Sequence, residues 1–153
     1  MGFKRLEDCH AFQLARAFKL AVYALVDESP AATGDFRFAS QIRDAVSSGE
    51  SNVGEGYYRF HAGEISHFLR IALGSMKEGH LRLRDGIDRG YFAQARCEEA
   101  FQLGDRAMGA TRRWRESLEP FVQRNRRRSQ SKGPNEFRKR PPPPRLRDPD
   151  PDL

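Results

Sequence analysis

Two glycine-containing stretches, QIRDAVSSGESNVGEG at residues 41–56 and IALGSMKE at residues 71–78, carry the strongest indication of fold in this sequence. In the first stretch Ile42, Ala45, Val46 and Val53 recur at spacings of three, four and seven, which places them on one face of a helix. Glycine inside a helix costs about 1 kcal/mol relative to alanine. We therefore expect close approach of another backbone to compensate, and the predicted helix-packing glycines are Gly54, Gly56 and Gly74.

The same periodicity extends to both sides of these stretches. It predicts four helices, at residues 6–28, 40–58, 64–88 and 93–123, with Ser29, Pro30 and the residues after them as a connector and Gly90 as a helix end. No segment shows the alternating apolar pattern of a strand, and the connections are short. The sequence thus predicts an all-α fold, an antiparallel up-and-down four-helix bundle.

The charge distribution separates the last thirty residues from the rest. Residues 124–153 hold ten Lys or Arg against four Asp or Glu, which accounts for the whole formal net charge of +6. This segment is rich in Arg, Pro and Ser and has almost nothing to bury, so it cannot offset the entropy of ordering itself. We predict a bundle domain over residues 1–123 and a disordered, basic, Pro-rich tail over residues 124–153.

The two stretches resemble the patterns QLRRAxxSIPSNIAEG and IAxGSLxE of the large-subunit ribosomal RNA intervening-sequence proteins, a family of four-helix bundles. Two positions depart from the pattern, because Gly49 and Glu50 replace its Ile-Pro pair and Asp44 replaces its second Arg. The resemblance implies a homo-oligomer. Similar proteins that serve diversity-generating retroelements form pentameric barrels that bind nucleic acid and a reverse transcriptase. The residues that match are Gln41, Ile42, Arg43, Ala45, Ser48, Ser51, Asn52, Val53, Glu55, Gly56, Ile71, Ala72, Gly74, Ser75 and Glu78.

A polar cluster within the matching residues has two interpretations. It binds a ligand or partner, or it forms a hydrogen-bond network that fixes how helices and subunits meet, with Glu55 paired to Arg43 or Arg59. The second interpretation is favoured because no nucleophile or oriented base lies nearby in the sequence. The cluster comprises Arg43, Ser48, Asn52, Glu55, Arg59, Ser75 and Glu78.

Catalytic and cofactor motifs are missing from the sequence, so we predict a non-enzymatic protein without a cofactor. The alternative is a di-metal enzyme built on the two Glu-x-x-His pairs Glu7/His10 and Glu64/His67. The helical register disfavours this alternative, because His67 points nearly opposite the apolar stripe of its helix.

The basic segment is the second functional candidate. Its side chains can neutralise phosphates of RNA or DNA with salt-dependent affinity, or they can serve only to keep the protein in solution. The run RPPPPR at residues 140–145 also fits a ligand of a proline-binding domain. The candidate nucleic-acid-binding residues are Arg124, Arg126, Arg127, Arg128, Lys132, Arg138, Lys139, Arg140, Arg145 and Arg147.

Compartment and partners follow from the remaining residues. No segment is apolar enough to span a membrane, and two cysteines do not make a disulfide framework, so we expect a cytoplasmic protein with Cys9 and Cys97 as small hydrophobes. His61 and His80 are expected to be solvated. Two functions stay open: a nucleic-acid-binding or ribonucleoprotein accessory protein, and an assembly scaffold whose partner is another protein.

Overall fold

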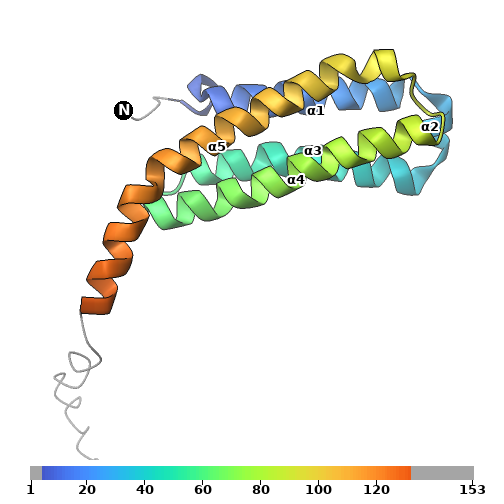
Figure 1. Ribbon diagram of the computed structural model, residues 1–153. Coiled ribbons are helices and arrows are strands. Elements are labelled where there is room, and N and C mark those ends of the chain that lie inside the picture. The colour runs from blue at the N-terminus through green and yellow to red at the C-terminus, as the bar shows by residue number, and fades with distance from the viewer. Residues whose placement is uncertain (1–4, 132–153) are drawn as a thin grey trace, which may run out of the picture. The chain divides into compact units, whose positions relative to one another are not determined.

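The chain is all-α, as the sequence predicts. The computed structural model describes residues 5–131, and that part of the chain contains helices and no strand. Four long helices, α1, α3, α4 and α5, carry the fold, and a short helix, α2, joins the first two (Figure 1). The elements are the 3-10 helix η1 (Leu6–Asp8), α1 (His10–Asp27), α2 (Pro30–Gly34), α3 (Phe36–Tyr57), α4 (Ala62–Asp88) and α5 (Gln94–Ser131).

The first half of the chain differs from the predicted helix boundaries in three places. The expected helix 6–28 is interrupted at Cys9, whose extended backbone separates η1 from α1. The expected connector contains α2, because the Ser29 hydroxyl accepts a hydrogen bond from Ala32 N and Pro30 follows at the first helical position. The next helix begins at Phe36 instead of residue 40, since the Asp35 carboxylate accepts a hydrogen bond from Phe38 N at 3.0 Å.

The turn between α4 and α5 is fixed by the predicted glycine. Gly90 has a φ of +75°, and the amides of Gly90 and Tyr91 donate to the carbonyls of Ile87 and Gly86 at 2.9 and 2.8 Å. This pair of bonds is the Schellman motif, which satisfies carbonyls at a helix end. The Ser29 hydroxyl donates to the Tyr91 carbonyl at 2.8 Å, so the start of α2 is tied to the same turn.

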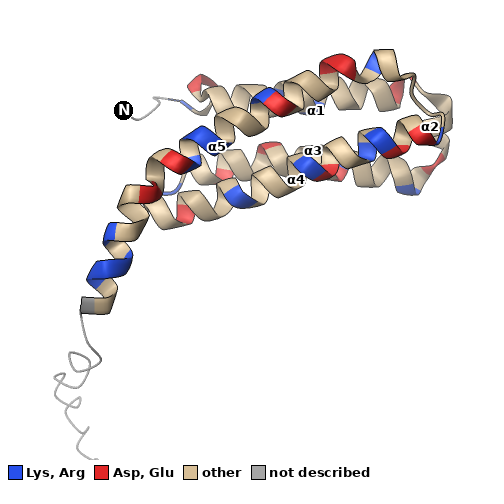
Figure 2. Cartoon of the chain, in the orientation of Figure 1, with Lys and Arg blue, Asp and Glu red and all other residues tan. Residues whose placement is uncertain are grey.

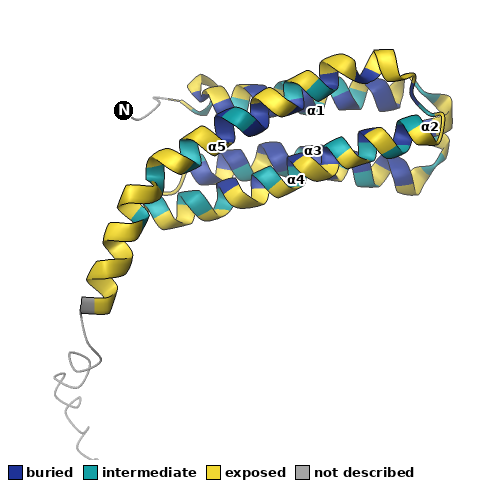
Figure 3. Cartoon of the chain, viewed as in Figure 1, coloured by how far each residue is buried: buried dark blue, intermediate teal, exposed yellow. Residues whose placement is uncertain are grey.

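The core lies along the faces that the long helices turn toward one another, as the dark blue segments of Figure 3 show. Both cysteines are in it, as predicted, and burial raises the pKa of both thiols. The largest fully buried side chains are Phe18, Ile42, Leu69, Met76, Leu83, Val22, Val26, Val46, Val53, Thr111, Cys9 and Cys97.

Glycines receive side chains across the α3–α4 contact. A Cβ on Gly49 would lie 2.9 Å from Met76 Cγ, and a Cβ on Gly79 would lie 2.8 Å from Val46 Cγ1. Each helix therefore offers a hole that a side chain of the other fills. Gly54 and Gly56 make ordinary contacts, with Cβ positions 3.6 Å from Phe12 and 3.4 Å from Leu69.

Gly74 does not match its predicted role within the chain. Nothing lies within 4 Å of a Cβ built on it, because Gly74 is on the exposed side of α4. The sequence analysis placed Gly74 beside the apolar stripe of its helix. Successive residues of a helix are turned by about 100°, and this turn puts Gly74 on the exposed side, although Ala72 and Met76 are buried. Its role at an interface between subunits stays a prediction.

The last helix is longer than predicted. The compact part of the chain ends at Val122, and α5 runs through Pro120 to Ser131. The prediction of disorder is therefore wrong for residues 124–131. Extending a formed helix adds one hydrogen bond per residue without a new nucleation step, and arginine and glutamine are good helix formers. Residues 132–153 of the predicted tail lie outside the described residues.

Candidate functional site

Three members of the predicted polar cluster form one network between α3 and α4. The hydroxyl oxygens of Ser48 and Ser75 lie 2.9 Å apart, within hydrogen-bond distance. The Asn52 amide donates to the Ser48 carbonyl at 2.8 Å and to its hydroxyl at 3.2 Å. This geometry favours the packing interpretation for these residues, because their polar groups are already paired with one another.

The other four members lie in separate ion pairs. Arg59 donates to Glu55 at 2.7 Å and Arg82 donates to Glu78 at 3.4 Å, both one helical turn apart. Arg43 instead pairs with Asp27 at the end of α1. Glu78 and Arg43 therefore do not take part in the Ser48 network. Of the two arginines proposed as partners of Glu55, Arg43 and Arg59, the structure pairs it with Arg59.

A buried carboxylate close to the network was missed by the sequence interpretation. Only 9% of the Glu50 side chain is exposed, and it accepts hydrogen bonds from Arg16 Nη1 at 3.2 Å and from Lys19 Nζ. The two basic residues are the ones that interrupt the apolar run of α1. Two basic residues one helical turn apart within an apolar run were the sequence signal for an acidic partner on a neighbouring helix.

His80 was expected in solvent and is instead inserted between helices. Its ring makes edge contacts with Phe18 of α1 and Phe101 of α5, at centroid distances of 5.4 and 5.2 Å. Nε2 is buried without a hydrogen-bond partner in the described part of the chain, and it faces the bare backbone of Gly104. Burial lowers the pKa of His80 despite the nearby Asp105 carboxylate.

The residues of the di-metal alternative do not come together. Glu64 and His67 are exposed at the start of α4, and His67 Nδ1 lies 3.4 Å from Arg70. Glu7 is in η1 and His10 begins α1, both exposed. Between residues 5 and 131 there is no group of three or more His, Cys, Asp or Glu side chains arranged to hold a metal ion.

Four of the predicted nucleic-acid-binding residues lie on the last two turns of α5. Arg124, Arg126, Arg127 and Arg128 are helical and exposed, and no acidic residue occurs among residues 120–131 (Figure 2). Arg124, Arg127 and Arg128 share one side of the helix by their spacing of three and four. Lys132, Arg138, Lys139, Arg140, Arg145 and Arg147 lie outside the described residues.

The comparisons agree with the resemblance seen in residues 41–56 and 71–78. A sequence profile of the 23S rRNA-intervening sequence protein family matches residues 7–110. The search of curated proteins found no match to this chain. None of the helices within 5–131 is long and apolar enough to cross a membrane.

Proposed function

Because this chain belongs to the 23S rRNA-intervening sequence protein family, we propose that it is a non-enzymatic nucleic-acid-binding protein, an accessory of a ribonucleoprotein. Its body is a four-helix bundle made of α1, α3, α4 and α5. The bundles assemble into a homo-oligomer, with a pentamer as the form that the family resemblance implies. RNA or DNA is the partner, and a reverse transcriptase is the protein that would share the complex.

The observation that carries this proposal is the helical arginine array of residues 124–128. Four guanidinium groups are exposed on two turns of α5, without an acidic residue in those turns. Guanidinium groups bind phosphates with two parallel hydrogen bonds and remain charged at any physiological pH. Residues 1–123 hold equal numbers of acidic and basic residues, so the excess charge lies at this end of the chain.

An oligomer raises the affinity of such an array. Several copies on one particle bind one nucleic acid at once, so weak phosphate contacts combine through effective concentration. Gly74 and Ile71 leave room for a second subunit on α4, since the glycine contacts nothing and the Ile71 side chain is exposed.

The test replaces Arg124, Arg126, Arg127 and Arg128 with glutamine in the full chain. Binding of a single-stranded oligonucleotide should weaken, and the slope of log affinity against log salt should fall by up to about 3, because each lost phosphate contact removes about 0.7. The matched control replaces the same four residues with lysine, which keeps the charge and the slope. A full chain that fails to bind RNA and DNA at low salt would refute the proposal.

A protein partner is the second candidate, and it is favoured by exposed aromatic side chains. Phe60 and Tyr58, in the connection between α3 and α4, are 95% and 65% exposed. Exposed aromatic residues in a cluster mark contact sites on proteins. This scaffold function predicts that one protein is recovered with the chain from nuclease-treated lysate, and that Phe60→Ser abolishes its recovery.

A further inference from the structure

Cations without acidic partners lie along one face of α4. Arg70, Lys77 and Arg84 are seven residues apart, so they follow each other every two turns on the same side of the helix. None of the three makes an ion pair with another residue of the described chain, whereas Arg82 on the neighbouring face pairs with Glu78. Charges left unpaired in a row are available to the phosphates of an external ligand.

The contact between α4 and α5 lies beside this row. The Arg115 Nε of α5 donates to the Ser66 hydroxyl of α4 at 3.3 Å, and the Arg84 guanidinium lies over the Phe101 ring at 5.7 Å. Arginine side chains thus join α4 and α5 at both ends of their contact.

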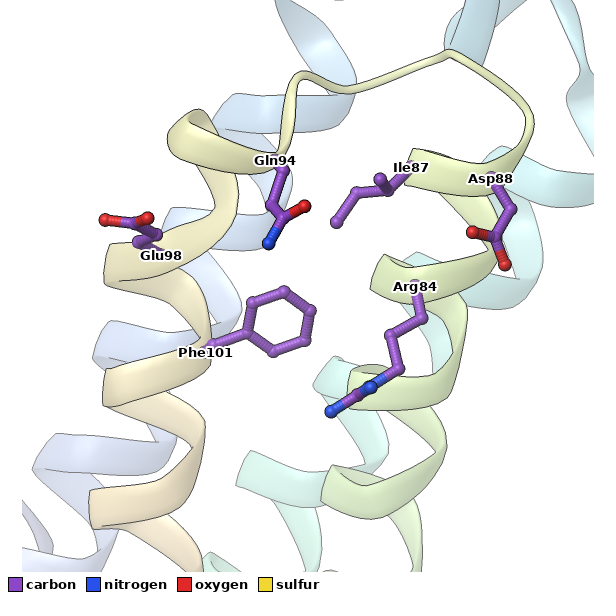
Figure 4. A pocket seen from close by; sticks show the side chains of 6 residues that line it. All are labelled: Arg84, Ile87, Asp88, Gln94, Glu98 and Phe101. Carbon is purple, nitrogen blue, oxygen red and sulfur yellow. The ribbon is translucent and has the colours of Figure 1, made fainter.

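A recess of about 350 Å³ opens at the Arg84 end of this contact. That volume falls in the range of small-molecule sites, roughly 300–1,000 Å³. Figure 4 shows Ile87, Gln94 and Phe101 pointing toward one another across the space between the two helices, while the carboxylates of Asp88 and Glu98 point away from it. The recess therefore combines an aromatic ring, an apolar wall, one amide and the Arg84 guanidinium, and Asp88 and Glu98 also line it.

We infer that the recess between α4 and α5 and the row beside it form a second nucleic-acid contact, in which the recess takes one unpaired base and the row Arg70, Lys77 and Arg84 takes the adjoining phosphates. The inference rests on the proposed function and assigns part of the binding to the body of the protein. The Phe101 ring stacks on the base, as aromatic side chains do in single-strand-binding proteins. Arg84, next to that ring, contacts the phosphate of the stacked nucleotide.

Gln94 gives the recess a polar group that recognises a base edge. Its amide carries both a donor and an acceptor, and it makes no hydrogen bond within the described residues. An amide of this kind pairs with the edge of a base that presents an amino group beside an acceptor. Cytosine presents that pattern on its base-pairing edge, which a duplex hides, so for cytosine the site favours single strands.

The experiment compares two probes of equal length and equal phosphate number, an oligodeoxycytidine and an abasic oligomer, on the full chain at low salt. The base-bearing probe should bind at least about fivefold more tightly, since stacking of a base on an aromatic side chain has about that effect or more. Phe101→Leu and Gln94→Ala should each reduce this preference. Gln102→Ala, an exposed glutamine elsewhere on α5, is the matched control and should keep it.

The row of cations is tested separately with the double variant Arg70→Gln and Lys77→Gln. Binding of both probes should weaken about equally, because phosphates are common to them. The matched control is the double variant Arg37→Gln and Arg106→Gln, which removes the same charge from exposed arginines that do not line the recess.

Two results would overturn the inference. If the full chain binds both probes equally, or if Gln94→Ala and Phe101→Leu retain the preference, the recess does not take a base and the proposed function rests on residues 124–128 alone. If the full chain binds neither probe, the proposed function itself fails. A thermal melt of each variant shows whether Phe101→Leu remains folded, and Gln94 is exposed at the first turn of α5, so its substitution leaves the core intact.

Discussion

Lys19 of α1 donates a hydrogen bond to the Glu50 carboxylate of α3, and Arg16 holds the other oxygen of the same carboxylate. Only 15% of the Lys19 side chain and 9% of the Glu50 side chain are exposed. Glu50 stands where the family pattern has proline. In this chain an ion pair between α1 and α3 therefore replaces a residue that would bend α3.

Replacing Glu50 with alanine should destabilise the protein by about 2–4 kcal/mol. The substitution leaves the nearly buried Lys19 ammonium without a counter-charge, and breaking a buried pair is more costly than breaking an exposed one. Chemical denaturation followed by circular dichroism measures the change. The control is Glu55→Ala, which removes an exposed pair one turn apart and should cost about 0.5 kcal/mol or less. Equal losses in the two variants would show that Glu50 has no special role.

The stability of the protein should depend on pH through His80. Burial lowers the pKa of this imidazole in the folded state, so the unfolded chain binds the proton first as the pH falls. The free energy of unfolding should therefore decrease as the pH falls below about 6.5, the ordinary pKa of histidine. Denaturation midpoints between neutral and acidic pH measure this decrease.

Two variants isolate the His80 contribution. His80→Leu should flatten the pH dependence, because no proton can then bind at this site. His61→Gln removes an exposed histidine and should leave the slope unchanged. If the His80→Leu variant keeps the full pH dependence of the free energy of unfolding, that dependence comes from other groups.

Gly104→Ala and Gly74→Ala should shift stability in opposite directions. A Cβ at Gly104 overlaps the His80 ring, which is wedged between Phe18 and Phe101, so we expect a loss of about 1–3 kcal/mol. A Cβ at Gly74 meets nothing, so alanine should stabilise α4 by up to about 1 kcal/mol. Thermal melts at low protein concentration compare the two.

Gly74→Ala also tests the interface. If Gly74 is a contact between subunits, the substitution lowers the oligomeric mass measured by light scattering while the subunit itself stays folded. An unchanged mass, together with the stability gain, would place the interface elsewhere.

Gly90→Ala should destabilise the turn between α4 and α5. Gly90 has a φ of +75°, and an alanine there costs roughly 1–2 kcal/mol. Gly34→Ala is the control, because Gly34 ends α2 with open space around it and without a positive φ. A Gly90→Ala protein as stable as the control would mean that the turn relaxes into another conformation.

The end of α4 and the close packing of α3 on α4 could be predicted because they depend on local sequence. Gly90 ends α4 as expected, and Gly49 and Gly56 receive the side chains of Met76 and Leu69 from α4, whereas Gly54 faces Phe12 of α1. Each of these features depends on a glycine at a particular position of a helical, apolar pattern. The existence of the buried faces could be inferred in the same way.

The contacts between helices could not be predicted because they depend on axial register and rotation. His80 faces Gly104, and Glu50 faces Lys19, only once four helices have been aligned along their lengths. Composition also misassigned residues 124–131, because a solvated arginine run can be either disordered or helical and the preceding helix selects the second state.

The reciprocal holes at Gly49 and Gly79 bear on the order of folding. Met76 and Val46 fill them across a single hairpin, and the Ser48–Ser75 bond joins the two arms of the same hairpin across 27 residues. Contacts between segments close in sequence form at a low entropic cost. We therefore expect the transition state for folding to contain this hairpin.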